Sequence, residues 1–189
     1  MRRAEPSPFL PPRRSNLAIV GSHPSVSPSV FSGDVEVWAF NNAVVMLPRV
    51  DIAFQMHQEV DWGGQYYRNW LKTNLTAPVY MREMHAEIPM SCAYPFEDVY
   101  ALTHCIRHRD RQLKYFTSSV AWALALAVQQ DRRKIDVYGV DLNEREYPQQ
   151  KDCFAFWMGF AGGRGIELNI HCADNIFDKP LYGAQALEL

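Results

Sequence analysis

The stretch Leu17-Ala18-Ile19-Val20-Gly21-Ser22-His23-Pro24-Ser25 decides the fold. Its first four residues form a short apolar run, which predicts a buried strand that ends at Gly21. The residues from Ser22 to Ser25 are types that form turns and begin helices. A strand followed by such a loop is typical of a chain in which strands and helices alternate.

Similar apolar runs predict strands at 35–40, 50–54, 78–81, 135–140 and 166–170. Apolar residues at helical spacing predict helices at 61–71, 118–130 and 148–160, and a further helix around 97–106 within the aperiodic segment 84–111. Thr117 or Ser118 is expected to cap the helix at 118–130. The sequence therefore predicts an α/β fold, a Rossmann-like three-layer sandwich with a mainly parallel sheet.

The composition agrees with a compact domain. The chain has 189 residues, of which 48% are hydrophobic and 21% are charged, and this profile excludes a disordered, collagen-like or coiled-coil protein. We interpret residues 1–14, rich in Arg and Pro, as a flexible N-terminal arm and residues 15–189 as a single Rossmann-like domain. The four cysteines are far apart, which predicts neither a disulfide framework nor a zinc knuckle and favours a reducing cytosol.

The charge balance limits the partners. Nineteen Lys and Arg against twenty-one Asp and Glu give a formal charge of −2, so nucleic acid and anionic membranes are not attracted by the whole molecule. No run of about eighteen apolar residues predicts a membrane span. An anionic ligand must therefore be held by a local site.

Ligands of parallel sheets bind beyond the carboxyl ends of the strands. The residues at these positions are small, polar or titratable: Gly21, Ser22, His23 and Ser25 after the first strand, Asn41 and Asn42 after the second, His57 after the third, and Asp141, Asn143 and Tyr147 after the penultimate one. Thr117, Ser118 and Ser119 precede a helix, whose first amide groups favour an anion. We expect these residues to converge on one edge and to hold a phosphorylated ligand.

Each of these residues also has a purely structural interpretation. Gly21 can shape a turn, and Thr117 to Ser119 can serve only as a helix cap. Asn41 and Asn42 can be turn residues, because asparagine tolerates a left-handed backbone. His57 can be a packed or surface histidine, and Asp141 can simply end its strand.

Four blocks of the sequence carry a family resemblance: AIVGSHPS at 18–25, WAFNN at 38–42, FTSSV at 116–120 and IDVYGVD at 135–141. They resemble the bacterial sialyltransferases of glycosyltransferase family 42 and the related archaeal 6-hydroxymethylpterin diphosphokinase-like proteins. Uncharacterised phage proteins look most similar, through Glu146-Tyr147, Phe156 to Gly159 and Gly163 to Ile166. A phage origin would place the protein in the host cytosol.

The resemblance implies roles for several residues. Gly21, Ser22, Ser25 and Asn41 would hold the cytidine monophosphate part of a donor. Thr117 and Ser118 correspond to a threonine-serine pair of the family, His57 lies near a family asparagine, and Tyr147 would steady the departing phosphate. Two positions depart from the family: His23 replaces a second glycine, and the histidine that removes the acceptor's proton has no counterpart, because His171 stands in a different context.

Two classes of function follow. The first is a transferase that passes a glycosyl or phosphoryl group from a nucleotide donor to an acceptor, with His23 or His57 as the general base and Tyr147 at the leaving phosphate. Glycosyl transfer of this kind implies no metal cofactor, whereas phosphoryl transfer would use Mg²⁺ held by Asp141 with Glu144 or Glu146. The second is a non-catalytic nucleotide-binding protein that senses or sequesters a nucleotide; a scaffold that binds no nucleotide is the remaining alternative.

Two other patterns leave alternatives open. His104 and His108 are four residues apart and could form a zinc pair on a helix, but Arg107, Arg109 and Arg111 favour a basic face that covers a donor or acceptor phosphate. The aromatic residues could pack in the core, stack on a base or form a subunit interface of a homo-oligomer. They are Tyr66, Tyr67, Trp70, Phe154, Phe156, Trp157 and Phe160.

Overall fold

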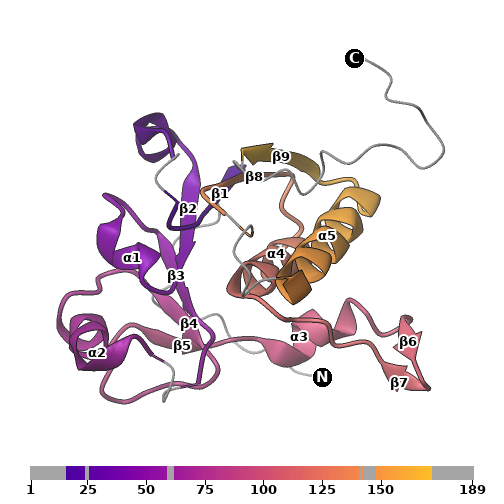
Figure 1. Cartoon of the computed structure of the whole chain (residues 1–189), viewed down its shortest axis with the longest axis horizontal. Helices are drawn as coiled ribbons and strands as arrows, with labels where there is room; N and C mark the ends of the chain where they lie inside the picture. The colour runs from indigo at the N-terminus through magenta and orange to yellow at the C-terminus, as the bar shows by residue number, and fades with distance from the viewer. Residues whose placement is uncertain (1–15, 24–25, 59–61, 141, 143–147, 172–189) are drawn as a thin grey trace.

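A parallel sheet forms the centre of the protein (Figure 1). The computed structural model describes residues 16–23, 26–58, 62–140, 142 and 148–171, so the predicted N-terminal arm lies outside the described residues. Seven strands form the sheet in the order β5-β4-β3-β2-β1-β8-β9, and every neighbouring pair is parallel. The strands are β1 (Asn16–Val20), β2 (Glu36–Phe40), β3 (Ile52–Gln55), β4 (Val79–Met81), β5 (Ser91–Ala93), β8 (Lys134–Tyr138) and β9 (Glu167–His171). The predicted α/β fold with a mainly parallel sheet is confirmed.

The path of the chain creates a switch point between β1 and β8. From β1 the chain builds the sheet outward in one direction, strand by strand, to β5. It then returns and adds β8 on the opposite side of β1, followed by β9. The loops after β1 and β8 therefore leave the same edge next to each other, which is where ligands bind in open α/β sheets.

Helices cover both faces of the sheet, as Figure 1 shows. The 3₁₀ helix η1 (Pro28–Phe31) and the helices α1 (Ala43–Met46) and α2 (Gly64–Thr73) cover one face; α3 (Phe96–Ala101), α4 (Ser119–Gln129) and α5 (Pro148–Gly163) cover the other. Strand β1 demonstrates the alternation: Leu17 and Ile19 pack in the cluster with α4 and α5, whereas Ala18 and Val20 pack in the cluster with η1. All four side chains are buried, as a strand between two helical layers requires.

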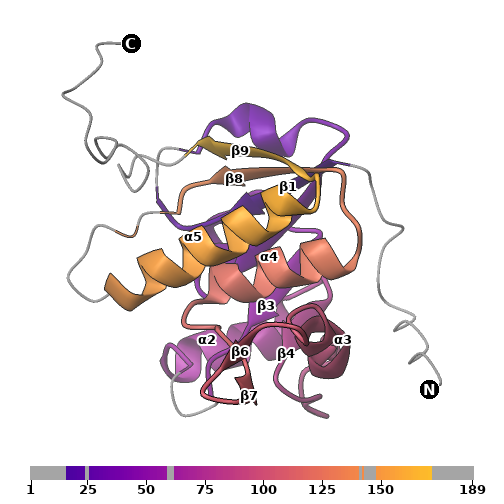
Figure 2. The ribbon, with the colours of Figure 1, turned by 90° about the vertical axis from the view of Figure 1, so that its right-hand side faces the viewer.

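Helix α4 is the buried support of the sheet. Ser118 is its N-cap in an extended conformation, and its Oγ accepts a hydrogen bond from the Ala121 amide. Eight of its eleven residues are buried, because α4 lies between the sheet and α5 (Figure 2). Within the described part of the chain no helix is both long enough and apolar enough to cross a bilayer.

The predicted helix at 61–71 begins later than its aromatic pattern indicates. Helix α2 starts at Gly64, so Tyr67 and Leu71 are its buried residues. Tyr66 is 75% exposed, so it does not pack in the core. Trp62 is buried from the loop before the helix. The reason is the helical phase: residues four apart share a face, and the inward face here carries Tyr67 and Leu71.

The aperiodic segment 84–111 contains more structure than its pattern predicts. Residues Ser91–Ala93 form β5, the edge strand next to β4, and the helix expected around 97–106 is the shorter α3. A small antiparallel hairpin follows, built from β6 (Arg107–His108) and β7 (Arg111–Gln112). Its two-residue turn places Arg109 and Asp110 at positive φ, as hairpin turns of this length require.

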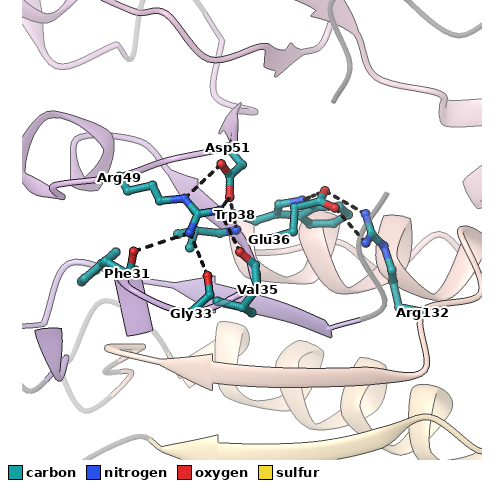
Figure 3. Close-up of polar contacts among 9 residues, drawn as sticks. Phe31, Gly33, Val35, Glu36, Trp38, Arg49, Asp51 and Arg132 are labelled. Carbon is teal, nitrogen blue, oxygen red and sulfur yellow. Dashed lines mark hydrogen bonds and ion pairs between the residues drawn. The ribbon is translucent and has the colours of Figure 1, made fainter. Parts of the chain in front are cut away.

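A buried ion pair joins β2 to the turn before β8 (Figure 3). Arg132 Nη1 and Nη2 donate to the two carboxylate oxygens of Glu36 at 2.9 and 2.8 Å, and both side chains are 2% exposed. The indole N–H of Trp38 donates to Glu36 at 2.7 Å, and the Arg132 guanidinium lies over the Trp38 ring. Every charge in this group is therefore compensated, which is what burial of an ion pair requires.

A second arginine fastens the loop that precedes β2. Figure 3 shows the Arg49 side chain pointing at Asp51 and at the carbonyl groups of this loop. Its guanidinium donates to the carbonyls of Gly33 and Val35 and to both oxygens of Asp51. Asp51 also accepts the Val37 amide, so a half-buried pair closes the amino end of β2.

Replacing Arg132 by Met tests the contribution of the buried pair. The substitution leaves the Glu36 carboxylate buried without its cationic partner, so we expect the free energy of unfolding to fall by about 3–5 kcal/mol. Urea denaturation followed by circular dichroism measures the change. Lys134→Met, which breaks the exposed pair with Glu167, is the control and should leave the midpoint almost unchanged. Equal midpoints for both variants would contradict this role of Arg132.

Candidate functional site

A cavity of about 480 Å³ opens at the carboxyl edge of the sheet. This volume suits a small organic ligand. Its wall contains predicted residues from four loops: Gly21, Ser22, His23, Asn41, Asn42, His57, Thr117, Ser118 and Ser119. The expected convergence on one edge is therefore found for the predicted residues that the structure describes. We call this cavity pocket 1.

Ser25, Asp141 and Tyr147 lie outside the described residues, as do Asn143, Glu144 and Glu146. Their predicted places at the phosphate, at the leaving group or at a magnesium ion stay predictions.

The floor of pocket 1 is a contact between two backbones. The Gly21 amide donates to the Tyr138 carbonyl at 2.8 Å, and the His23 amide donates to the Gly139 carbonyl at 3.1 Å. A Cβ atom on Gly21 would lie 2.2 Å from the Gly139 oxygen. Gly139 itself has a φ of 59°, a conformation that favours glycine. Two glycines are therefore needed for the loops after β1 and β8 to pass each other.

Asn41 connects the loop after β2 to helix α4. It has a φ of 53°, its amide donates to the Phe54 carbonyl, and its own carbonyl accepts the Tyr67 hydroxyl at 3.0 Å. The Asn41 carboxamide lies within hydrogen-bond distance of the Ser119 hydroxyl, with Nδ2 to Oγ at 3.1 Å. The turn interpretation of Asn41 is thus correct for its backbone, while its side chain contributes to the wall of pocket 1.

Tyr67 supports this loop as a neutral donor. Burial raises the pKa of Tyr67 far above its ordinary value of 10.0. The hydroxyl therefore keeps its proton throughout the physiological pH range, and the bond to the Asn41 carbonyl is retained. The sequence placed Tyr67 only among aromatic residues that could pack in the core, stack on a base or form an interface, and this contact was missed.

The amino end of α4 is held against α5. The Thr117 hydroxyl donates to the Gln149 carbonyl at 2.9 Å, and the Thr117 amide donates to Cys153 Sγ at 3.3 Å. The Cys153 thiol in turn donates to the Tyr115 carbonyl. These contacts orient the first turn of α4, whose partial positive charge lies at the wall of pocket 1. Ser118 is the helix cap, which confirms one of the two predicted cap residues, and it also lines pocket 1.

The histidines occupy different places. His23 is half-buried and His57 is exposed, and both line pocket 1. The His57 carbonyl accepts the indole N–H of Trp62 at 3.1 Å, which fastens the chain directly after β3. His57 also lines a second cavity, which we call pocket 2, and is therefore part of both walls. The other residues of pocket 2 are Gln55, Gln58, Trp62, Arg82, Glu83, His85 and Phe96.

The alternative prediction that His104 and His108 form a zinc pair on one helix is wrong. His104 follows α3, whereas His108 belongs to β6, so the two residues do not share a helix face. No group of three or more His, Cys, Asp or Glu side chains suitable for a metal ion occurs among the described residues. The hairpin arginines 107, 109 and 111 are exposed, but they are not in the wall of pocket 1. The three arginines form an exposed basic face, as predicted. They do not line pocket 1, so the predicted position of this face over a phosphate is not found there.

Several residues of the site were not predicted. Gly139, Val140 and Leu142 line pocket 1 after β8, and Gln150 lines it from the start of α5. The signal for Gly139 was available, because this glycine interrupts the apolar run at 135–140 close to its end, much as Gly21 ends the first run. Gln150 gave no comparable signal in the sequence.

The fold is shared with solved structures of a sialyltransferase, CstII from Campylobacter jejuni. The complex with cytidine-5'-monophosphate (CMP), described there as a substrate analogue, has a TM-score of 0.51 at 15% identity over 85% of this chain and 81% of that chain. The complex with CMP-3FNeuAc has a TM-score of 0.55 at 15% identity, over 86% and 82% respectively. A complex of the same enzyme with a trisaccharide acceptor and CMP has a TM-score of 0.54 at 14% identity, over 84% and 82%.

No family model matches the chain, and no curated protein sequence matches it. At 14–15% identity the likeness to the sialyltransferase structures establishes a common fold. The chain thus shares its α/β fold with these sialyltransferase structures, and it has a cavity lined in part by polar side chains at the switch point of the sheet. The resemblance to diphosphokinase-like and phage proteins stays a prediction.

Gly21→Ala tests the close approach at the floor of pocket 1. The added methyl group meets the Gly139 carbonyl, so the two loops must separate, and we expect unfolding to become easier by about 1–3 kcal/mol. Chemical denaturation measures this loss. Gly33→Ala is the matched control, because its Cβ would lie 4.0 Å from the nearest neighbour, Val35. If Gly21→Ala is as stable as Gly33→Ala, the backbone contact does not constrain the site.

Proposed function

We propose that this protein is a nucleotide-binding transferase that passes a glycosyl group from a nucleotide-linked donor to an acceptor hydroxyl. The observation that carries the proposal is pocket 1, where a glycine loop, an asparagine and the start of a buried helix meet at the switch point. These groups offer backbone amides, hydroxyls and a carboxamide to one ligand. A nucleotide presents matching phosphate and base edges.

The phosphate would lie between the loop after β1 and the start of α4. The buried glycine backbone at Gly21 allows a close approach, and the exposed Ser22 adds a hydroxyl donor. The first turn of α4 stabilises negative charge through its unpaired amides and its dipole. Asn41, held in place by Tyr67 and Ser119, would contact the nucleoside. Asn42, Thr117 and Ser119 complete the proposed nucleotide site.

The choice of donor follows from the structural neighbours. The sialyltransferase structures of the same fold hold CMP or CMP-3FNeuAc. A CMP-linked sugar is therefore the first donor to test here. The proposed transfer needs no metal, whereas the alternative phosphoryl transfer with Mg²⁺ would depend on Asp141, Glu144 or Glu146.

The reaction would proceed by displacement at the anomeric carbon. The acceptor oxygen forms a bond to that carbon while the bond from the carbon to the donor phosphate oxygen breaks, and the electron pair remains on the phosphate. The acceptor proton passes to an imidazole nitrogen of His57, the general base. His23, in the same pocket, is the alternative base, and Tyr147 would donate to the departing phosphate.

Asn41→Gly tests nucleotide binding. Glycine keeps the positive φ of this position but removes the carboxamide, so the fold should be retained while CMP binding weakens about tenfold. Isothermal titration calorimetry with CMP gives the dissociation constants. Asn69→Ala, on the exposed face of α2, is the control and should bind CMP like the unaltered protein. Unchanged binding in Asn41→Gly would remove Asn41 from the nucleotide site.

His57→Gln tests catalysis separately from binding. Loss of the base should lower the transfer rate by about 10²–10⁴-fold while the affinity for CMP stays the same. The assay follows release of CMP from a CMP-linked sugar in the presence of a panel of saccharide acceptors. Binding of CMP without turnover in the unaltered protein would instead identify a nucleotide sensor or sequestering protein, and no binding of any nucleotide would leave only a scaffold.

A further inference from the structure

A second cavity lies directly beside the proposed nucleotide site. Pocket 2 has a volume of about 400 Å³ and is formed by the residues after β3 and β4 together with the start of α3. His57 is part of the wall of both cavities. A ligand in pocket 2 therefore shares a side chain with a ligand in pocket 1.

Gln55 places a buried carboxamide in the wall of pocket 2, and one end of this carboxamide has no hydrogen-bond partner among the described residues. The residue is 2% exposed, and it lines the cavity from the last position of β3. Its Oε1 lies 3.3 Å from the Tyr67 hydroxyl. Among the described residues, nothing forms a hydrogen bond with its Nε2. A buried amide with one unmatched end costs free energy unless a ligand or water completes it.

Arg82 gives pocket 2 a group that can bind an anionic part of a ligand. Arg82 is exposed at the cavity and forms no ion pair with any carboxylate in the described part of the chain. His57, His85 and Gln58 add further N–H groups. Glu83 is the one carboxylate in the wall of this cavity, and it can accept hydrogen bonds from ligand hydroxyls. A guanidinium group pairs best with a planar carboxylate, through two parallel hydrogen bonds.

The apolar part of the wall is aromatic. Trp62 and Phe96 line the cavity, and the edge of the Trp62 ring system meets His85 with centroids 5.0 Å apart. Trp62 is fixed, because its indole N–H donates to the His57 carbonyl. Aromatic rings next to amides and charged groups fit a ring-shaped ligand with C–H faces and hydroxyl edges. A sugar ring has this shape and polarity.

We propose that pocket 2 is a second ligand site that binds a carboxylate-bearing sugar, with the carboxylate at Arg82 and ring hydroxyls at Gln55 and Glu83. Its position against His57 makes it the acceptor site of the transferase. That acceptor role depends on the proposed function, whereas binding of a sugar acid to pocket 2 does not.

The binding test uses two sugars that differ only at carbon 6. D-glucuronate carries a carboxylate there and D-glucose carries a hydroxymethyl group. In saturation-transfer NMR titrations of the full chain, glucuronate should bind about tenfold more tightly than glucose. Equal affinities, or no binding of either sugar, would overturn the proposal.

Two neighbouring variants locate the carboxylate. Arg82→Gln should weaken glucuronate binding about tenfold and abolish the preference over glucose. Glu83→Gln removes a hydroxyl acceptor that both sugars share, so it should weaken both alike and keep the preference. Arg107→Gln, an exposed arginine in the wall of neither cavity, is the matched control and should leave both affinities unchanged. Gln55→Met should weaken both sugars, with a thermal melt to verify that it folds. An Arg82→Gln variant that still prefers glucuronate would overturn the assignment.

Calorimetry with CMP separates this proposal from the proposed function. Neither Arg82→Gln nor Glu83→Gln should change CMP binding, because both residues line pocket 2 and not pocket 1. Glucuronate binding without CMP binding would refute the nucleotide site and leave pocket 2 standing. CMP binding without glucuronate binding would refute the sugar site in pocket 2 and leave the nucleotide site standing.

Discussion

The contact between Gly21 and Gly139 is the constraint on which the site depends. Strands β1 and β8 are neighbours in the sheet although more than a hundred residues separate them, because the chain completes one side of the sheet before it starts the other. Their following loops must leave the same edge within hydrogen-bond distance of each other. Only residues without a Cβ atom allow this approach, and the space above the two loops becomes pocket 1.

A single phenol connects the two cavities. The Tyr67 hydroxyl reaches from α2 to the Asn41 carbonyl beside pocket 1 and to Gln55 in the wall of pocket 2. Because burial keeps this hydroxyl protonated, its single proton stays available between the loop after β2 and the end of β3 over a wide range of pH. With His57 in both walls, a donor in one cavity and an acceptor in the other would meet at one imidazole. The polar side chains of the site thus lie at the carboxyl edge of the sheet. The buried pair of Glu36 and Arg132 lies at the other edge, where it stabilises the amino ends of β2 and β8.

The sequence predicts the frame of this arrangement better than its details. Apolar runs such as 17–20 and the Ser118 cap depend on local chemistry, so the strands, the buried helix and the convergence of polar loops were predicted. Strand β5 has only three residues and joins the sheet by pairing with β4, so no local pattern marks it. The same holds for pocket 2: Gln55, Arg82 and Trp62 come from separate segments, and only the fold brings them together. The spacing of His104 and His108 suggested a shared helix face, which the structure does not have. A spacing of four residues places two side chains together only within a continuous helix, and α3 ends before His104.

A crystal structure of the protein soaked with a mixture of nucleoside mono- and diphosphates tests whether pocket 1 binds a nucleotide. We expect a bound nucleotide in pocket 1, with its phosphate between the Gly21-Ser22 backbone and the first turn of α4 and its nucleoside beside Asn41. A nucleotide bound elsewhere, or an empty pocket 1 at saturating concentrations, would contradict this expectation.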